Sequence, residues 1–290
     1  MNNCIYWDIS GGGLSNRIKW WVSSMRVKDY YKLPIIYYWN SSRHECNCNF
    51  ENLFQNKLNF TTDKNVFKKR DKLVFLDGWR LYLFENDIDK NFAKAYPHKQ
   101  KDIDVRWAIH EIGPFNGECI DLEYNRIPKN LIDIYLPYFK SIKPINLITD
   151  IVNNFSEKNF NDNVVGVHIR RTDHMKKKDR NTHTDEKYFI EMDKILQENS
   201  KIKFFICTDC QITQNKFLEH YSNSFYYKKR DKLNTRNSIT GIQDAYIDIL
   251  LLSKLKYILA SPKSTFTEVA WWFGECKAYV KQCDGVQRLP

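Results

Sequence analysis

The sequence predicts an α/β protein made of two Rossmann-like domains that face each other across a cleft. Strand-like and helix-like segments alternate regularly through the carboxyl half, which is typical of a parallel sheet wrapped by helices. The amino half opens in the same way, with a strand, a glycine turn and a long helix. Lys143-Pro144 interrupts the helical pattern between the halves, so we expect one domain over residues 1–143 and a second over residues 144–290.

In the amino half, apolar residues 4–9 predict a first strand, and Gly11-Gly12-Gly13 predicts a turn. A long helix is expected over residues 14–32, since Pro34 ends it. Further strands are expected at residues 35–39, 73–76 and 105–109, and a helix at residues 131–139. The pattern over residues 43–100 is irregular and predicts no order of elements.

In the carboxyl half, β-branched and aromatic runs mark the strands, and apolar residues at helical spacing mark the helices between them. The expected strands are residues 164–170, 202–208, 224–227, 257–260 and 278–281. The expected helices are residues 185–198, 211–221, 241–253 and 264–273.

The composition of the 290 residues narrows the class of protein. Hydrophobic residues make up 42% and aromatic residues 15%, which is enough for a large core and argues against disorder. The net charge of +10 favours an anionic partner, whether a nucleotide, a nucleic acid or a membrane surface. No stretch approaches the roughly 20 apolar residues of a membrane helix, and the first ten residues are too mixed for a signal peptide. We therefore expect a cytoplasmic protein, unless an anchor has been removed.

The eight cysteines do not have the spacing of a disulfide framework. Cys207 and Cys210 form a C-x-x-C, which would suit a redox or zinc site. A zinc site needs a second pair, however, and Cys46-Asn47-Cys48 has the wrong spacing. We expect instead that Cys207 ends a buried strand and that Cys210 begins the next turn.

Two adjacent arginines, Arg170 and Arg171, directly follow the apolar run of residues 164–169. A guanidinium group stays charged and needs partners for its five donors. The carboxyl end of a parallel strand borders the ligand crevice, where two such cations would suit a diphosphate. The alternative is two surface arginines on a loop.

The turn at Gly12-Gly13, followed by Asn16 and Arg17, resembles a phosphate-binding loop at the start of a helix. It is neither G-x-G-x-x-G nor a P-loop, so it indicates no nucleotide class, and a plain tight turn is the alternative.

Polar residues also follow the other strands of the carboxyl half. Thr208-Asp209 ends one strand, and Ser264-Thr265 opens the helix after another. Ser264 or Thr265 would cap that helix, and such a cap can also hold phosphate. Asp248 lies in an otherwise apolar helix and needs a partner, either the two adjacent donors of guanine or an arginine such as Arg236.

Three motifs in this order and spacing resemble those of the α1,6-fucosyltransferase superfamily. This group includes eukaryotic core fucosyltransferase and rhizobial nodulation fucosyltransferase, with protein O-fucosyltransferases more distant. The motifs are Val167-His168-Ile169-Arg170-Arg171-Thr172-Asp173, Phe205-Ile206-Cys207-Thr208-Asp209, and Asp248-Ile249-Leu250-Leu251-Leu252-Ser253 with Ser264 and Val269-Ala270.

The resemblance implies a GT-B fold and an inverting, metal-independent transfer of L-fucose from GDP-fucose to a glycan hydroxyl. The carboxyl domain would bind the donor and the amino domain would lie on the acceptor side. The implied roles are phosphate binding by Arg170 and Arg171, guanosine contacts by His168 and Asp248, β-phosphate binding by Ser264 and Thr265, and organisation of the site by Asp173 and Asp209.

The catalytic base stays open between Asp179, Asp173 and His174. His183 and Tyr188 match a family pattern in register, and Asp179 falls where the core enzyme has an acidic residue. His174 and Cys210 depart from the family's lysine and aspartate at those positions.

Three other interpretations remain open at the level of sequence. They are a related transferase that uses another GDP-sugar, an inert GDP-sugar-binding homologue and, more remotely, a nucleic-acid-binding protein, although no RRM, KH or helix-turn-helix signature supports the last.

Overall fold

The computed structural model describes residues 4–10, 12–42, 45–68, 73–76, 80–82, 129–171, 184–233, 235–262 and 264–283. The chain forms two compact units, Met1–Pro144 and Ile145–Pro290. The division lies one residue from the expected boundary, and each unit is described by itself.

The amino unit contains a four-stranded sheet in the order β2-β1-β3-β4. Strands β1, β2 and β3 are parallel, and β4 pairs with β3 in the antiparallel sense. Its elements are β1 (Ile5–Asp8), α1 (Leu14–Tyr31), β2 (Ile35–Tyr38), η1 (Phe50–Asn52), η2 (Lys64–Lys68), β3 (Leu73–Leu76), β4 (Arg80–Tyr82) and α3 (Lys129–Ser141).

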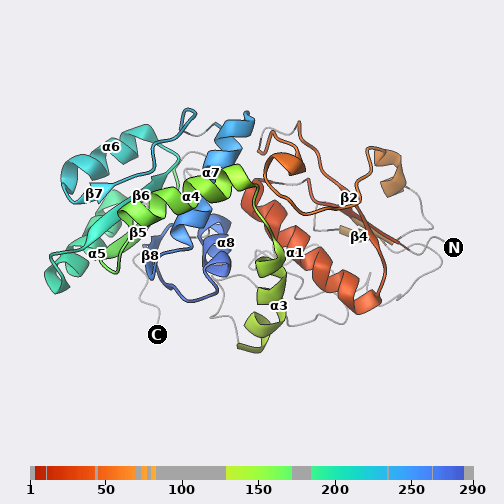
Figure 1. The fold of residues 1–290 in the computed structure, drawn as a ribbon, viewed down its shortest axis with the longest axis horizontal. Helices are drawn as coiled ribbons and strands as arrows, with labels where there is room; N and C mark the ends of the chain where they lie inside the picture. The colour runs from red at the N-terminus through yellow and green to blue at the C-terminus, as the bar shows by residue number, and fades with distance from the viewer. Residues whose placement is uncertain are drawn as a thin grey trace. The chain divides into compact units, whose positions relative to one another are not determined.

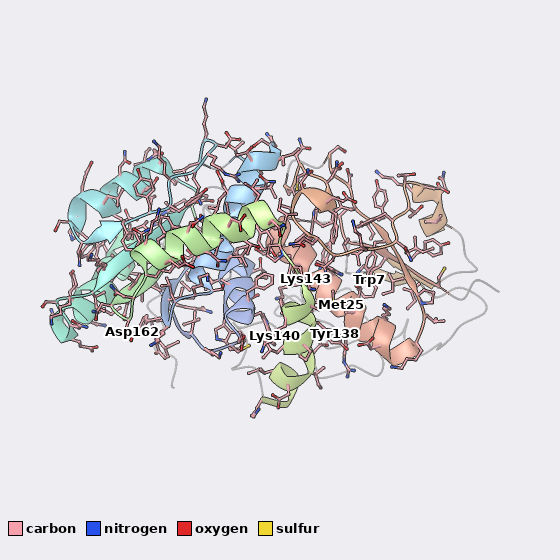
Figure 2. The ribbon with its side chains drawn as sticks, viewed as in Figure 1. Trp7, Met25, Tyr138, Lys140, Lys143 and Asp162 are labelled. Carbon is pink, nitrogen blue, oxygen red and sulfur yellow. The ribbon has the colours of Figure 1, made fainter. Side chains whose placement is uncertain are left out.

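Helix α3 packs beside α1 in this unit, as the labelled side chains of Met25 and Tyr138 show in Figure 2. The hydroxyl of Tyr138 donates a hydrogen bond of 2.7 Å to Asp29 of α1. The hydroxyl of Ser141 lies 3.8 Å from the sulfur of Met25.

The carboxyl unit contains a five-stranded parallel sheet in the order β7-β6-β5-β8-β9, with helices packed around it (Figure 1). The first strand of the unit is central and the order reverses between β5 and β8, as in nucleotide-binding folds. The elements are α4 (Asn146–Asn159), β5 (Val164–Ile169), α5 (Asp185–Glu198), β6 (Lys203–Thr208), α6 (Gln211–His220), β7 (Ser224–Phe225), α7 (Ile239–Leu252), β8 (Tyr257–Ala260), α8 (Thr265–Phe273) and β9 (Tyr279–Gln282).

Alternate residues of β5 face different layers of this unit. Val165, Val167 and Ile169 belong to a buried cluster with residues of α5 and α6. A side chain at Gly166 would instead meet Leu252 at the end of α7. Strand β5 is therefore covered on both faces, which explains its continuous apolar run.

The described strands and helices confirm the expected elements to within two residues at each end. Helix α7 begins two residues early because the side chain of Ser238 caps it, accepting a bond of 3.0 Å from the Gly241 amide. Strand β4 and helix α4 were not expected. The strand expected at residues 105–109 lies outside the described residues.

Cys207 is buried in β6 and Cys210 is the N-cap of α6, as the sequence predicts. All seven cysteines in the described part of the chain are free thiols. No helix within the described ranges has both the length and the apolar character needed to cross a membrane.

Candidate functional site

The candidate site lies at the carboxyl end of β5, where the strand order reverses. Strands β5 and β8 pair in register as far as Val167 and Leu259. Beyond that point, side-chain hydroxyl groups take the place of the backbone hydrogen bonds between the two strands. The carbonyl of His168 accepts bonds from Tyr188 (3.0 Å) and Ser261 (3.3 Å), and Ser261 accepts a bond of 2.7 Å from the amide of Arg170. The backbone that carries Arg170 is thus fixed before a ligand arrives.

The two arginines that follow β5 lie in different surroundings. Arg171 continues the alternation of Val167 and Ile169, and its guanidinium lies over the ring of Tyr188 on α5, 5.9 Å from the ring centroid. Arg170 comes two residues after His168, at the position that alternation assigns to the same face as His168. Arg170 is half-buried, whereas Arg171 is 7% exposed.

The guanidinium of Arg171 pairs with the carboxylate of Asp185, the first residue of α5. The second oxygen of that carboxylate accepts a bond of 2.6 Å from Lys216 of α6. Arg171 is therefore held by the protein itself in this conformation, whereas the family resemblance implies that both arginines bind phosphate.

Burial raises the pKa of Asp185, but the bonds from Lys216 and Arg171 outweigh that effect, so its pKa lies below the ordinary value. A depressed carboxyl pKa stabilises the fold above the unfolded value of about 3.9, and this contribution is lost as the pH falls through the folded pKa. We expect the difference in unfolding free energy between the wild type and Asp185→Asn to shrink below about pH 4. Urea unfolding from pH 3 to pH 6 measures it. A difference that stays constant over this range would contradict the depressed pKa.

Asp209 organises the same turn from the end of β6. One oxygen accepts a bond of 2.8 Å from the amide of Arg171, and the other lies 4.0 Å from Arg236. The hydroxyl of Thr208 accepts a bond of 3.3 Å from the amide of Cys210. Both residues therefore shape the backbone at the edge of the sheet.

His168 is buried at 5% exposure, and its ring faces α8. Its Nδ1 lies 2.7 Å from the hydroxyl of Thr267, and the ring stacks on Phe266 with centroids 4.7 Å apart. These contacts tie the end of β5 to the first turn of α8.

Ser264 is the N-cap of α8 but does not cap it with its side chain. The residue is 3% exposed, and its hydroxyl has no hydrogen-bond partner among the residues that the structure describes. A buried hydroxyl without a partner is costly in a folded protein. Ser264 and Thr265 thus place a hydroxyl at the start of a helix, a combination that binds anions.

Asp248 is buried at 6% exposure in α7 and forms an ion pair with Lys229. Burial raises its pKa, and the charge of Lys229 opposes that effect. The partner is a lysine, whereas Arg236, expected as one alternative, lies 4.0 Å from Asp209.

The glycine turn belongs to the amino unit. Gly12 has a φ of +65°, and Gly13 is the N-cap of α1. A side chain at Gly12 would meet Asn16 at 2.6 Å. Arg17 is fully buried and donates to the carbonyls of Gly12 (3.3 Å) and Asn40 (3.0 Å), which gives it a structural role in this turn.

Asp173 and Asp179, predicted as catalytic, lie outside the described residues, as do His174 and His183. Within the described ranges, no group of three or more potential metal ligands occurs. The sequence analysis missed Asp185, Lys216, Ser261 and Lys229. Strand alternation could have indicated that Arg170 and Arg171 point to different faces, but it does not identify Asp185 as the partner of Arg171.

No protein-family model and no curated protein sequence matches the chain. Solved structures do match it. The alpha-1,6-fucosyltransferase NodZ co-crystallised with GDP is 15% identical, with 93% of this chain and 92% of that chain covered and a TM-score of 0.54. NodZ from Bradyrhizobium is 14% identical over the same shares, with a TM-score of 0.54. POFUT1 in complex with GDP is 12% identical, with 98% and 99% covered and a TM-score of 0.55. The predicted α/β fold of GT-B type, and the resemblance to fucosyltransferases at the level of the fold, are confirmed.

Proposed function

We propose that this chain, which has the fold of fucosyltransferases, is a glycosyltransferase that moves L-fucose from GDP-fucose to a glycan hydroxyl. The transfer would proceed with inversion and without a metal ion. NodZ and POFUT1 were solved with GDP, which supports a GDP-sugar as the donor.

The observation that carries this proposal is the buried hydroxyl of Ser264 at the start of α8. His168 contacts the same first turn of α8 through Thr267, and Arg170 follows His168 with the same strand parity. A guanidinium and a helix start at one place suit a diphosphate group. We propose that the donor phosphates bind there.

The chemistry of sugar transfer requires positive charge at the diphosphate. When the bond between the sugar and the diphosphate breaks, negative charge develops on the leaving GDP. Arg170 and the amides of α8 would stabilise that charge from fixed positions. Inversion then needs one base to take the proton from the acceptor hydroxyl. Asp179, Asp173 and His174 remain the candidates for it.

GDP should raise the thermal stability of the protein, and UDP should raise it much less. A ligand at about 100 times its dissociation constant adds roughly 2.7 kcal/mol to the unfolding free energy. The guanine preference would come from His168 and Asp248. Thermal unfolding with GDP, UDP, ADP and TDP measures the ranking, and equal shifts for GDP and UDP would refute the guanine assignment.

Ser264→Ala provides a matched test of the phosphate site in the same assay. The variant removes a hydroxyl without a described partner, so the protein alone should be no less stable. Its stabilisation by GDP should be smaller than that of the wild type. An undiminished shift would argue against phosphate at the start of α8.

EDTA should leave the transfer activity largely intact, because Arg170 and the start of α8 would supply the positive charge. The rate of GDP release from GDP-fucose with a glycan acceptor is measured with and without the chelator. Loss of activity with EDTA, restored by manganese, would show a metal-dependent reaction instead.

A further inference from the structure

Asp185 uses both oxygens of its carboxylate on two different elements. One oxygen pairs with Arg171 at the end of β5, and the other accepts a bond of 2.6 Å from Lys216 of α6. The side chain of Asp185 is 20% exposed and that of Arg171 is 9% exposed, so the pair is largely removed from water. The carboxylate thereby joins β5, α5 and α6 at the carboxyl edge of the sheet.

The backbone of Arg171 is held independently of its side chain. Its amide donates a bond of 2.8 Å to Asp209 at the end of β6. One residue earlier, the amide of Arg170 donates a bond of 2.7 Å to Ser261 after β8. Hydrogen bonds from two consecutive backbone amides therefore meet at this turn, together with the ion pair between Asp185 and the side chain of Arg171.

The direction of the Arg171 side chain follows from the geometry of the strand. Successive side chains of a strand point to opposite faces. Strand β5 ends at Ile169, and we infer that this alternation continues over the two arginines that follow it. Arg171 lies on the face of α5, over Tyr188. Ser264 starts α8, which contacts β5 from the other face through Thr267 and His168.

We propose that Asp185 is a positioning residue, which fixes Arg171 on the α5 face and so holds the turn that presents Arg170 to the donor diphosphate. Arg171 then acts as a strut, by which we mean a side chain that braces the turn from within the protein and does not contact the ligand. Arg170 is the arginine that contacts the ligand. This inference rests on the proposed function for the identity of the ligand. It assigns the two arginines different roles, and it explains why the carboxylate lies beside the second one.

A double-mutant cycle tests the strut without any ligand. Arg171→Met leaves the carboxylate of Asp185 without its arginine, and Asp185→Leu leaves the buried guanidinium without its carboxylate. Each single variant should unfold at lower urea concentration than the wild type. The double variant Arg171→Met/Asp185→Leu should be more stable than the sum of the two losses, since no buried charge is stranded. Additive losses would overturn the pairing.

Lys216→Ala is the matched control for this cycle. It removes the second cation from the same carboxylate and leaves Arg171 paired. Its effect on stability should be small, because the side chain of Lys216 is 47% exposed. A loss as large as that of Arg171→Met would place the strut at Lys216 instead.

GDP binding shows whether Arg171 braces the turn or contacts the diphosphate. Isothermal titration is run well below the unfolding temperature of each variant, so stability alone does not affect the result. The double variant should bind GDP about threefold more weakly than the wild type, because the turn that presents Arg170 is no longer held, whereas Arg170→Ala should bind at least about tenfold more weakly, a factor that corresponds to about 1.4 kcal/mol. An unchanged affinity in the double variant would overturn the role of Asp185 in presenting Arg170. If the double variant binds as weakly as Arg170→Ala, Arg171 contacts the diphosphate and the proposed role is wrong.

The kinetic constants add a second measurement. Asp185→Asn should lower kcat/KM for GDP-fucose, and Arg171→Lys, which keeps a charge for Asp185, should retain more activity than Arg171→Met. Equal losses in the lysine and methionine variants would overturn the role. A wild type that binds no GDP would overturn the proposed function and the presentation of Arg170 with it, while the stability cycle would still decide whether Asp185 holds the turn.

Discussion

Arg170→Ala should reduce kcat/KM for sugar transfer by about a hundredfold to a thousandfold, the range measured when one preorganised donor to a developing charge is removed. Arg170 follows the central strand of the carboxyl unit, and its amide is fixed by Ser261. The guanidinium is the cation that we assign to the departing diphosphate. Steady-state release of GDP from GDP-fucose measures the effect.

Arg170→Lys should recover part of the activity but not all of it, since an ammonium group does not bind two phosphate oxygens in the manner of a planar fork. Lys228→Ala, at an exposed position of the same unit, is the control for a general loss of positive charge. The unfolding midpoint of Arg170→Ala should stay close to that of the wild type. A near-normal rate in Arg170→Ala would remove the arginine from the phosphate site.

Asp179→Asn should reduce the turnover number by roughly a hundredfold or more, the contribution of a well-placed general base. Asp179 lies in the polar segment of residues 176–185, between the arginine pair and α5. The lysines of this segment, Lys176, Lys177 and Lys178, would favour the ionised carboxylate that accepts a proton. The affinity for GDP should hardly change, because the base acts on the acceptor.

Asp173→Asn and His174→Gln are the parallel variants that decide between the three candidates. The base should be the one whose loss lowers the turnover number and leaves GDP affinity intact. If Asp179→Asn turns over at the normal rate, Asp179 is not the base, and the remaining two variants show which residue replaces it.

The fold could be predicted from the sequence because each strand of the carboxyl unit carries its own local signal. The run of Val164 to Ile169 is apolar except for His168 and is buried at every position, as a central parallel strand requires. Strand β4 could not be predicted, since Arg80, Leu81 and Tyr82 are too few for a pattern and form a strand through pairing with β3. Local sequence does not record such long-range pairing.

The candidate site could be predicted in part. The strand ends at Arg170, Asp209 and Ser264 follow from polar residues placed after apolar runs. The partners of the charged groups could not be predicted, because pairing depends on loops whose course the sequence does not reveal. The sequence offered Arg236 as a partner for Asp248, and the structure pairs Asp248 with Lys229.

The order of strands in the carboxyl unit also bears on how the protein is made. Strand β5 leaves the ribosome first but occupies the centre of the sheet, and its neighbour β8 follows only much later in the chain. The Arg170 amide and the Ser261 hydroxyl that close this edge are 91 residues apart. Until β8 emerges, one edge of β5 has no partner, and an open apolar edge of this kind promotes aggregation. A nascent chain that ends before Tyr257 therefore exposes that edge, and the bond between the Arg170 amide and the Ser261 hydroxyl cannot yet form.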